Sequence, residues 1–121
     1  MLIEVVTAAL LSTGAIGFDE AKILADRDEA TLRAPFASSL IESQGNVAGL
    51  AFAACIPSPP PSSLPSFTIV FVLDSTGKVQ KTWLKGDSQF AMCVRDKFAA
   101  ATFFNPPKAP FYTSFDFKFK P

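Results

Sequence analysis

The sequence contains no histidine and only two cysteines among its 121 residues. The absence of histidine excludes the Ser-His-Asp triad, the Cys-His pair and the histidine ligands of most zinc sites. Two cysteines cannot form an all-cysteine zinc site, which needs four thiolates. We therefore expect no metal site, no cofactor and no catalytic residues, and we expect that the protein is not an enzyme.

Charged residues are also few, and the eleven basic side chains balance the eleven acidic ones. This balance argues against a general nucleic-acid binder. The two halves of the chain nevertheless differ. Residues 1–60 carry seven acidic and three basic side chains (net −4), and residues 61–121 carry four acidic and eight basic ones (net +4). Either the halves attract each other on folding, or the basic half steers toward an acidic partner.

No apolar run is long enough to span a membrane. The stretch Val5–Gly17 is shorter than the roughly 20 residues that a transmembrane helix needs. Its length suits the core of a signal peptide, but Glu4 stands where such a signal carries Lys or Arg. A signal peptide is therefore not visible in this numbering, and we interpret Leu2–Ser12 as a buried or half-buried helix.

The rest of the first half has helical patterns, so residues 1–55 are predicted to form a helical segment. A second helix starts near Asp19, because acidic residues suit the first turn of a helix. Pro35 breaks or restarts the helix. Gly45-Asn46 indicates a helix end, and Val47–Cys55 is predicted to be a further helix.

Residues 56–66 are rich in Pro and Ser and are predicted to be a linker. The period then changes to that of strands. Phe67–Leu73 is apolar on both faces, which predicts a central strand. Asp74-Ser75-Thr76-Gly77 predicts a turn in which Gly77 adopts positive φ. Val79–Leu84 is the expected return strand.

A helix near Gln89–Ala101, with Asp87 or Ser88 as its N-cap, and a strand over Phe111–Phe119 complete the second half. The last strand alternates apolar and polar residues, which predicts a sheet with one covered face. The fold class is therefore α+β, in which the N-terminal helical segment packs with a small antiparallel sheet to form one compact domain.

Phenylalanine is unusually abundant, with thirteen in the chain and ten of them in the second half. Each buried ring removes roughly 150–250 Å² from water. The rings therefore either build the core or, in part, stay exposed and mark an interface.

The order of motifs in residues 66–121 resembles the C-terminal domain of TonB and of TolA-like energy transducers. The matching pieces are Phe67–Leu73, Asp74-Ser75-Thr76-Gly77-Lys78-Val79, the helix near Gln89–Ala101, Phe104-Asn105-Pro106-Pro107 and Phe111–Phe119. In that family, segments of outer-membrane receptors add as strands to the edge of the sheet. The resemblance implies that Tyr112–Lys120 could pair with a partner in this way.

The same resemblance implies the oxidising bacterial periplasm as the compartment. In such a compartment Cys55 and Cys93 would form a disulfide between the two halves of the chain. The alternative is two free, buried thiols.

The predicted function is non-catalytic protein binding in the periplasm, in which an inhibitor or immunity-type protein occludes a toxin or hydrolase. The alternative is a soluble TonB/TolA-like module that binds a receptor or envelope peptide by strand addition. Homodimerisation through the same edge is compatible with both functions. The candidate partner-binding residues are Trp83, Tyr112, Ser114, Lys118 and Lys120.

Each kind of candidate has an alternative role. The two aromatic residues could instead belong to the core, and the two lysines could instead prevent aggregation through the sheet edge.

Overall fold

The computed structural model describes residues 16–119, which form three helices and a three-stranded antiparallel sheet. The predicted α+β fold class is confirmed. The predicted helix over Leu2–Ser12 lies outside the described residues. In the part of the chain that the structure describes, no helix combines the length and apolar character needed to cross a membrane. The elements are α2 (Phe18–Ala30), α3 (Phe36–Cys55), β1 (Phe67–Leu73), β2 (Val79–Lys85), α4 (Gln89–Ala99) and β3 (Phe111–Phe117).

The sheet has the strand order β2-β1-β3, so β1 is the central strand, as its apolar faces predicted. Val70 of β1 pairs with Trp83 on one side and with Ser114 on the other. A bulge between Val72 and Leu73 interrupts the pairing with β2 near the turn. The remaining edges of the sheet are the outer sides of β2 and β3.

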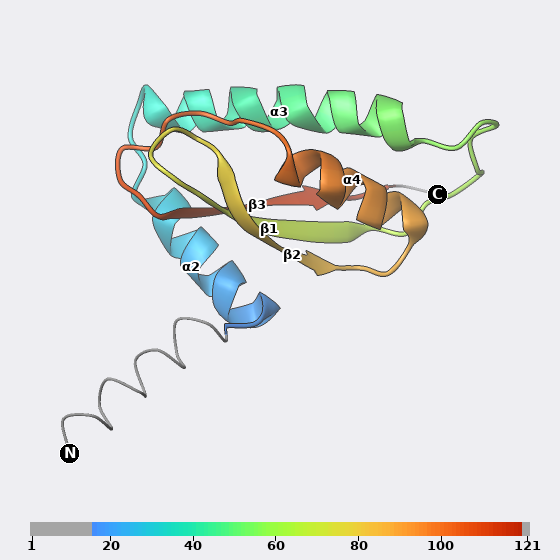
Figure 1. Cartoon of the computed structure of the whole chain (residues 1–121), viewed down its shortest axis with the longest axis horizontal. Coiled ribbons are helices and arrows are strands. Elements are labelled where there is room, and N and C mark those ends of the chain that lie inside the picture. The colour runs from blue at the N-terminus through green and yellow to red at the C-terminus, as the bar shows by residue number, and fades with distance from the viewer. Residues whose placement is uncertain (1–15, 120–121) are drawn as a thin grey trace, which may run out of the picture.

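Helices cover both faces of the sheet, with α3 and α4 over one face and α2 against the other (Figure 1). Phe71 points into the core under α3 and α4, whereas Val70 packs against Ala21 and Ala25 of α2. The predicted sheet with one covered face is therefore wrong. The buried residues of α2 are two small alanines and Asp28, so this helix covers the sheet without a strongly apolar sequence pattern.

Helix α3 runs unbroken for 20 residues, so the predicted helix end at Gly45-Asn46 is wrong. A mid-helix glycine costs about 1 kcal/mol relative to alanine. Burial of Gln44 and Ala48 on either side of these residues holds the helix together across them. The predicted break at Pro35 is confirmed, because this residue is the N-cap of α3.

Phenylalanine rings fill the core between the sheet and α4. The Phe98 side chain is fully buried and meets the ring of Phe71 edge-on, with 5.5 Å between the centroids. Of the ten rings in the second half, eight are buried, which favours the core interpretation for most of them. These eight are Phe67, Phe71, Phe90, Phe98, Phe103, Phe104, Phe111 and Phe117.

The turn between β1 and β2 depends on Gly77 and Asp74. Gly77 has the predicted positive φ, at 84°. A Cβ there would lie 2.5 Å from the carbonyl oxygen of Phe103, so both backbone conformation and space require glycine. The Asp74 carboxylate accepts hydrogen bonds from the Thr76 hydroxyl and from the backbone N–H of Lys78. These bonds lower the pKa of Asp74, with the hydroxyl as the largest cause.

The predicted disulfide between Cys55 and Cys93 is confirmed, with an Sγ–Sγ distance of 2.07 Å. It joins the last residue of α3 to the middle of α4. At the start of α4, the Ser88 hydroxyl accepts a hydrogen bond from the N–H of Ala91, so Ser88 is the N-cap. The two helices are therefore fixed over the same face of the sheet.

Candidate functional site

The outer edge of β3 is already hydrogen-bonded to side chains of α2. The N–H of Tyr112 donates to Oδ2 of Asp28 at 2.9 Å, and the N–H of Ser114 donates to Oε2 of Glu29 at 2.9 Å. Successive N–H groups of a strand point to opposite sides, so these two, which are two residues apart, both point away from β1 and toward α2. The two carboxylates therefore take the positions that the carbonyl groups of an added strand would occupy.

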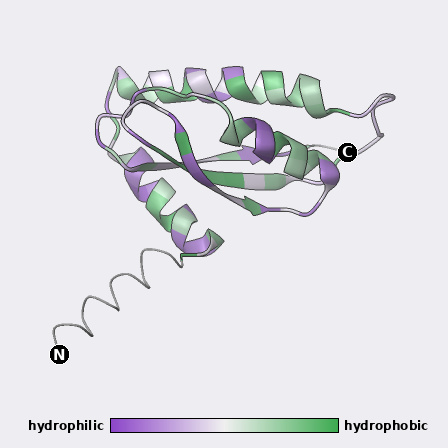
Figure 2. Cartoon of the chain, viewed as in Figure 1, coloured by the Kyte–Doolittle hydropathy of each residue, from purple (hydrophilic) through white to green (hydrophobic). Residues whose placement is uncertain are grey.

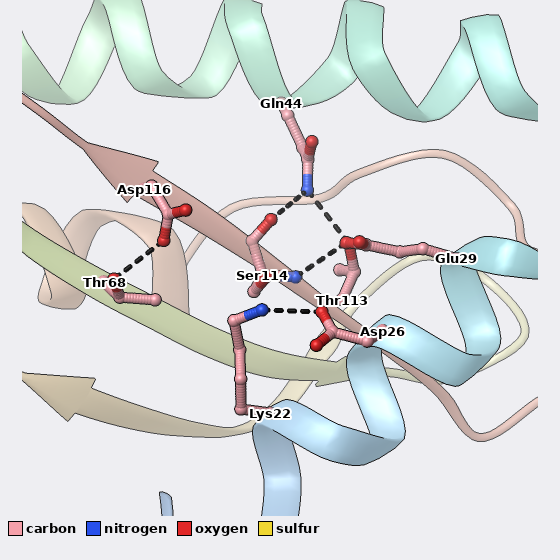
Figure 3. Close-up of polar contacts among 8 residues, drawn as sticks. All are labelled: Lys22, Asp26, Glu29, Gln44, Thr68, Thr113, Ser114 and Asp116. Atoms are coloured by element: carbon pink, nitrogen blue, oxygen red, sulfur yellow. Dashed lines mark hydrogen bonds and ion pairs between the residues drawn. The ribbon is translucent and has the colours of Figure 1, made fainter. Parts of the chain in front are cut away.

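Helix α3 completes this arrangement, which we call the β3 cap (Asp28, Glu29 and Gln44). Figure 3 shows Gln44 reaching down from α3, where its Nε2 donates to the carbonyl oxygen of Ser114 and to Oγ1 of Thr113, each at 3.0 Å. The Thr113 hydroxyl in turn donates to Glu29. The β3 edge is thus closed at Tyr112 and Ser114, where the sequence predicted strand addition.

The buried carboxylate of the β3 cap has a charged partner. Asp28 is only 3 % exposed, and the Nζ of Lys108 lies 3.3 Å from its Oδ1. A buried carboxylate is costly unless it is paired and hydrogen-bonded, and Asp28 has both kinds of partner. This pair joins the acidic first half to the basic second half, as the attraction between the halves predicted.

The neighbouring acidic residue of α2 has a different environment. Asp26 forms an exposed ion pair with Lys22 one turn earlier, at 2.6 Å (Figure 3). The hydrogen bond to Asp26 raises the pKa of Lys22. Exposed pairs of this kind contribute little to stability. Within residues 16–119, no three Asp, Glu or Cys side chains are grouped in a way that could hold a metal ion.

The predicted partner-binding residues do not form one surface. Trp83 and Tyr112 lie side by side on the α2 face of the sheet, 5.8 Å between ring centroids, and both are half-buried. The indole Nε1 of Trp83 donates to the carbonyl oxygen of Ile16. Ser114 belongs to the closed β3 edge, and Lys118 is exposed beyond the end of β3. Lys120 lies outside the described residues.

A surface that the sequence did not reveal lies between α3 and α4, which we call the α3–α4 groove. It has a volume of about 270 Å³. Leu50 at its rim is 75 % exposed, and Lys97 is the one charged residue in its lining. The second half of α3 contains no charged residue and is mostly apolar (Figure 2). The lining residues are Val47, Leu50, Ala51, Ala54, Lys97 and Ala101.

The signal for this groove was present in the sequence. Residues 43–55 form thirteen helical positions without a charge, although an ordinary amphipathic helix carries charges on its outer face. The expected helix end at Gly45-Asn46 divided this run in two and concealed its length.

Comparisons with protein-family models, with curated proteins and with solved structures gave no match for this chain. The resemblance to the TonB C-terminal domain therefore stays a prediction.

The β3 cap should contribute measurably to stability. We expect Glu29→Ala to lower the free energy of unfolding by about 1–3 kcal/mol, because the Ser114 N–H loses its acceptor in a half-buried position. Urea denaturation followed by circular dichroism measures the change. Glu42→Ala, which removes an exposed carboxylate from α3, is the control and should change stability by less than about 0.5 kcal/mol. Equal values for the two variants would show that the cap contributes nothing.

Proposed function

We propose that this chain is a non-catalytic protein-binding domain of the bacterial periplasm that binds a folded partner through the α3–α4 groove. The observation that carries the proposal is the exposed Leu50 at the rim of an apolar groove. Exposed apolar patches with polar surroundings are typical of protein-binding sites. An inhibitor or immunity-type protein that occludes a toxin or hydrolase would use such a surface.

The rigidity of the groove supports binding through side chains. The disulfide holds α3 against α4, and the rings of Phe52 and Phe90 add an edge-on contact between the same helices at 5.5 Å. A groove that is rigid before binding loses little conformational entropy when a partner docks. An apolar side chain of the partner would fill the groove, and an acidic group beside it would face Lys97.

The disulfide also supports the periplasm as the compartment, because disulfides persist in oxidising environments and are rare in the cytosol. The β3 cap, in contrast, counts against strand addition at Tyr112–Lys120. A partner strand at this edge would have to displace Glu29 and Gln44 from their bonds to Ser114. We therefore favour a folded partner at the groove over a receptor peptide at β3.

The test compares two glutamates placed on the same helix. The oxidised protein, Leu50→Glu and Ile41→Glu serve as baits in an envelope extract, and captured proteins are identified by mass spectrometry and then purified. Ile41 is 70 % exposed but does not line the groove, so it is a matched control. With a purified hydrolase or toxin, we expect a stoichiometric complex and loss of the enzyme's activity. Leu50→Glu should weaken binding at least tenfold in calorimetry, and Ile41→Glu should not.

Two results would overturn this proposal. One is a complex that forms equally well with Leu50→Glu and the unchanged protein. The other is a complex that leaves the captured enzyme fully active, because an inhibitor must block the enzyme that it binds.

A further inference from the structure

The outer edge of β2 differs from that of β3, because its backbone groups are free. Because the N–H groups of Tyr112 and Ser114 point away from β1, the backbone groups of their β1 partners Val72 and Val70 point toward β2. The β2 residues whose backbone N–H and C=O groups bond to β1 are therefore Lys81, Trp83 and Lys85. The N–H and C=O groups of Thr82 and Leu84 therefore point outward. No residue of the described chain forms a hydrogen bond with these four groups.

The open part of this edge has a defined length. At the start of β2, the chain after α4 lies alongside, with a bridge between Lys78 and Thr102 and a bond from the N–H of Phe103 to the carbonyl oxygen of Gly77. Beyond this point β2 is the outermost strand in Figure 1. The edge is thus closed near the turn and open at Thr82 and Leu84.

The side chains along the open edge carry positive charge on the α2 face. Lys81 lies over the indole of Trp83, with its Nζ 5.1 Å from the ring centroid, and the Nζ of Lys85 lies 5.7 Å from the ring centroid of Phe18. Neither lysine has an acidic partner among residues 16–119. The nearest acidic residues along the chain are Asp74, whose carboxylate is hydrogen-bonded within the turn, and Asp87, which is exposed after β2. In space, Asp116 of β3 lines the same surface pocket as Lys85.

We infer that the β2 edge binds an extended acidic segment of another protein as a fourth strand. The segment would bond to the free groups of Thr82 and Leu84, and its alternate side chains would lie beside Lys81, Trp83 and Lys85. The matching pattern on that face is acidic, apolar, acidic. This site is separate from the α3–α4 groove, so it stands or falls independently of the proposed function.

The positive charge of the β2 edge favours an acidic segment over the β2 strand of a second copy of the chain. In an antiparallel pair of β2 strands centred on Trp83, Thr82 of each copy bonds to Leu84 of the other, which uses all the free groups. The same register places Lys81 of each copy opposite Lys85 of the other. Like charges directly opposite each other are destabilising.

The test uses a synthetic peptide with the sequence acetyl-Thr-Glu-Thr-Val-Thr-Glu-Thr-amide and a matched peptide with Lys in place of both Glu residues. Binding to the full chain is followed by NMR shifts and by hydrogen exchange of backbone amides. We expect the acidic peptide to protect the amides of Thr82 and Leu84. We expect the Lys peptide to bind at least tenfold more weakly, with the difference decreasing as salt is added.

Two variants separate backbone pairing from charge. Thr82→Pro removes an outward N–H without breaking the ladder to β1, and should abolish binding. Lys81→Glu with Lys85→Glu should bind the acidic peptide at least tenfold more weakly and the Lys peptide correspondingly better. If Thr82→Pro does not fold, the change of the double variant from preferring the acidic peptide to preferring the Lys peptide still tests the inference. Leu50→Glu, which changes the α3–α4 groove, should leave peptide binding unchanged.

Several results would overturn the inference. These are unchanged binding by folded Thr82→Pro, equal binding of both peptides, protection at Tyr112 and Ser114 in place of the β2 amides, and no binding at millimolar peptide. A dimer in light scattering, with Thr82 and Leu84 protected before any peptide is added, would also overturn it and assign the edge to a second copy.

Discussion

Reduction of the Cys55–Cys93 disulfide is expected to lower the free energy of unfolding by about 3–4 kcal/mol. The bond closes a loop with a sequence separation of 38 residues, and this loop includes the linker, β1 and β2. Breaking the bond gives the unfolded chain a larger set of conformations and so stabilises it relative to the native state. Urea denaturation with and without a thiol reductant measures the loss.

The double substitution Cys55→Ala and Cys93→Ala controls for side effects of the reductant. This variant should show the same loss whether or not the reductant is present. The unfolding midpoint of the unchanged protein should fall to that of the variant only after reduction. An unfolding curve that does not move on reduction would contradict the prediction, and mass spectrometry after alkylation would show whether both thiols had been free.

The strands could be predicted from the sequence because their signals are local. Alternation of apolar residues gave Phe67–Leu73 with the bounds that the structure has. Gly77 marked the turn, and Ser88 was one of two candidates for the N-cap of α4. Each of these features depends on residues within one strand, one turn or one helix end, so a single sequence contains the information.

The features that the sequence did not predict depend on residues far apart. Glu29 bonds to Ser114 across 85 positions, and Gln44 bonds to the same residue across 70. No spacing rule relates such residues. The continuity of α3 through Gly45 follows from burial on its inner face, which overrides local helix propensity.

These long-range bonds make the two edges of the sheet unequal. The acidic side chains of the first half close β3, and the buried Asp28 pairs with Lys108 of the second half. Lys81 and Lys85 of β2 form no ion pair with an acidic residue of the described part of the chain. Part of the charge asymmetry between the halves is therefore used within the fold, whereas Lys81 and Lys85 of β2 form no such ion pair.

The second large effect concerns the phenylalanine core. We expect Phe98→Ala to lower the free energy of unfolding by about 3–5 kcal/mol, because the cavity would lie among rings that cannot collapse into it without losing their own contacts. The Phe98 ring is fully buried and lies 5.5–6.1 Å, between centroids, from four other rings. Those rings belong to Phe71, Phe103, Phe115 and Phe117.

Phe36→Ala is the matched control, because this ring is 39 % exposed at the start of α3. It should cost about 1–2 kcal/mol, less than Phe98→Ala, because a partly exposed ring has less transfer free energy to lose and its removal leaves no closed cavity. Phe98→Leu, which keeps much of the side-chain volume, should cost less than about 1.5 kcal/mol and remains measurable if Phe98→Ala does not fold. Equal losses for Phe98→Ala and Phe36→Ala would contradict the ring-built core. A large difference between them would support the interpretation that the buried phenylalanines build the core.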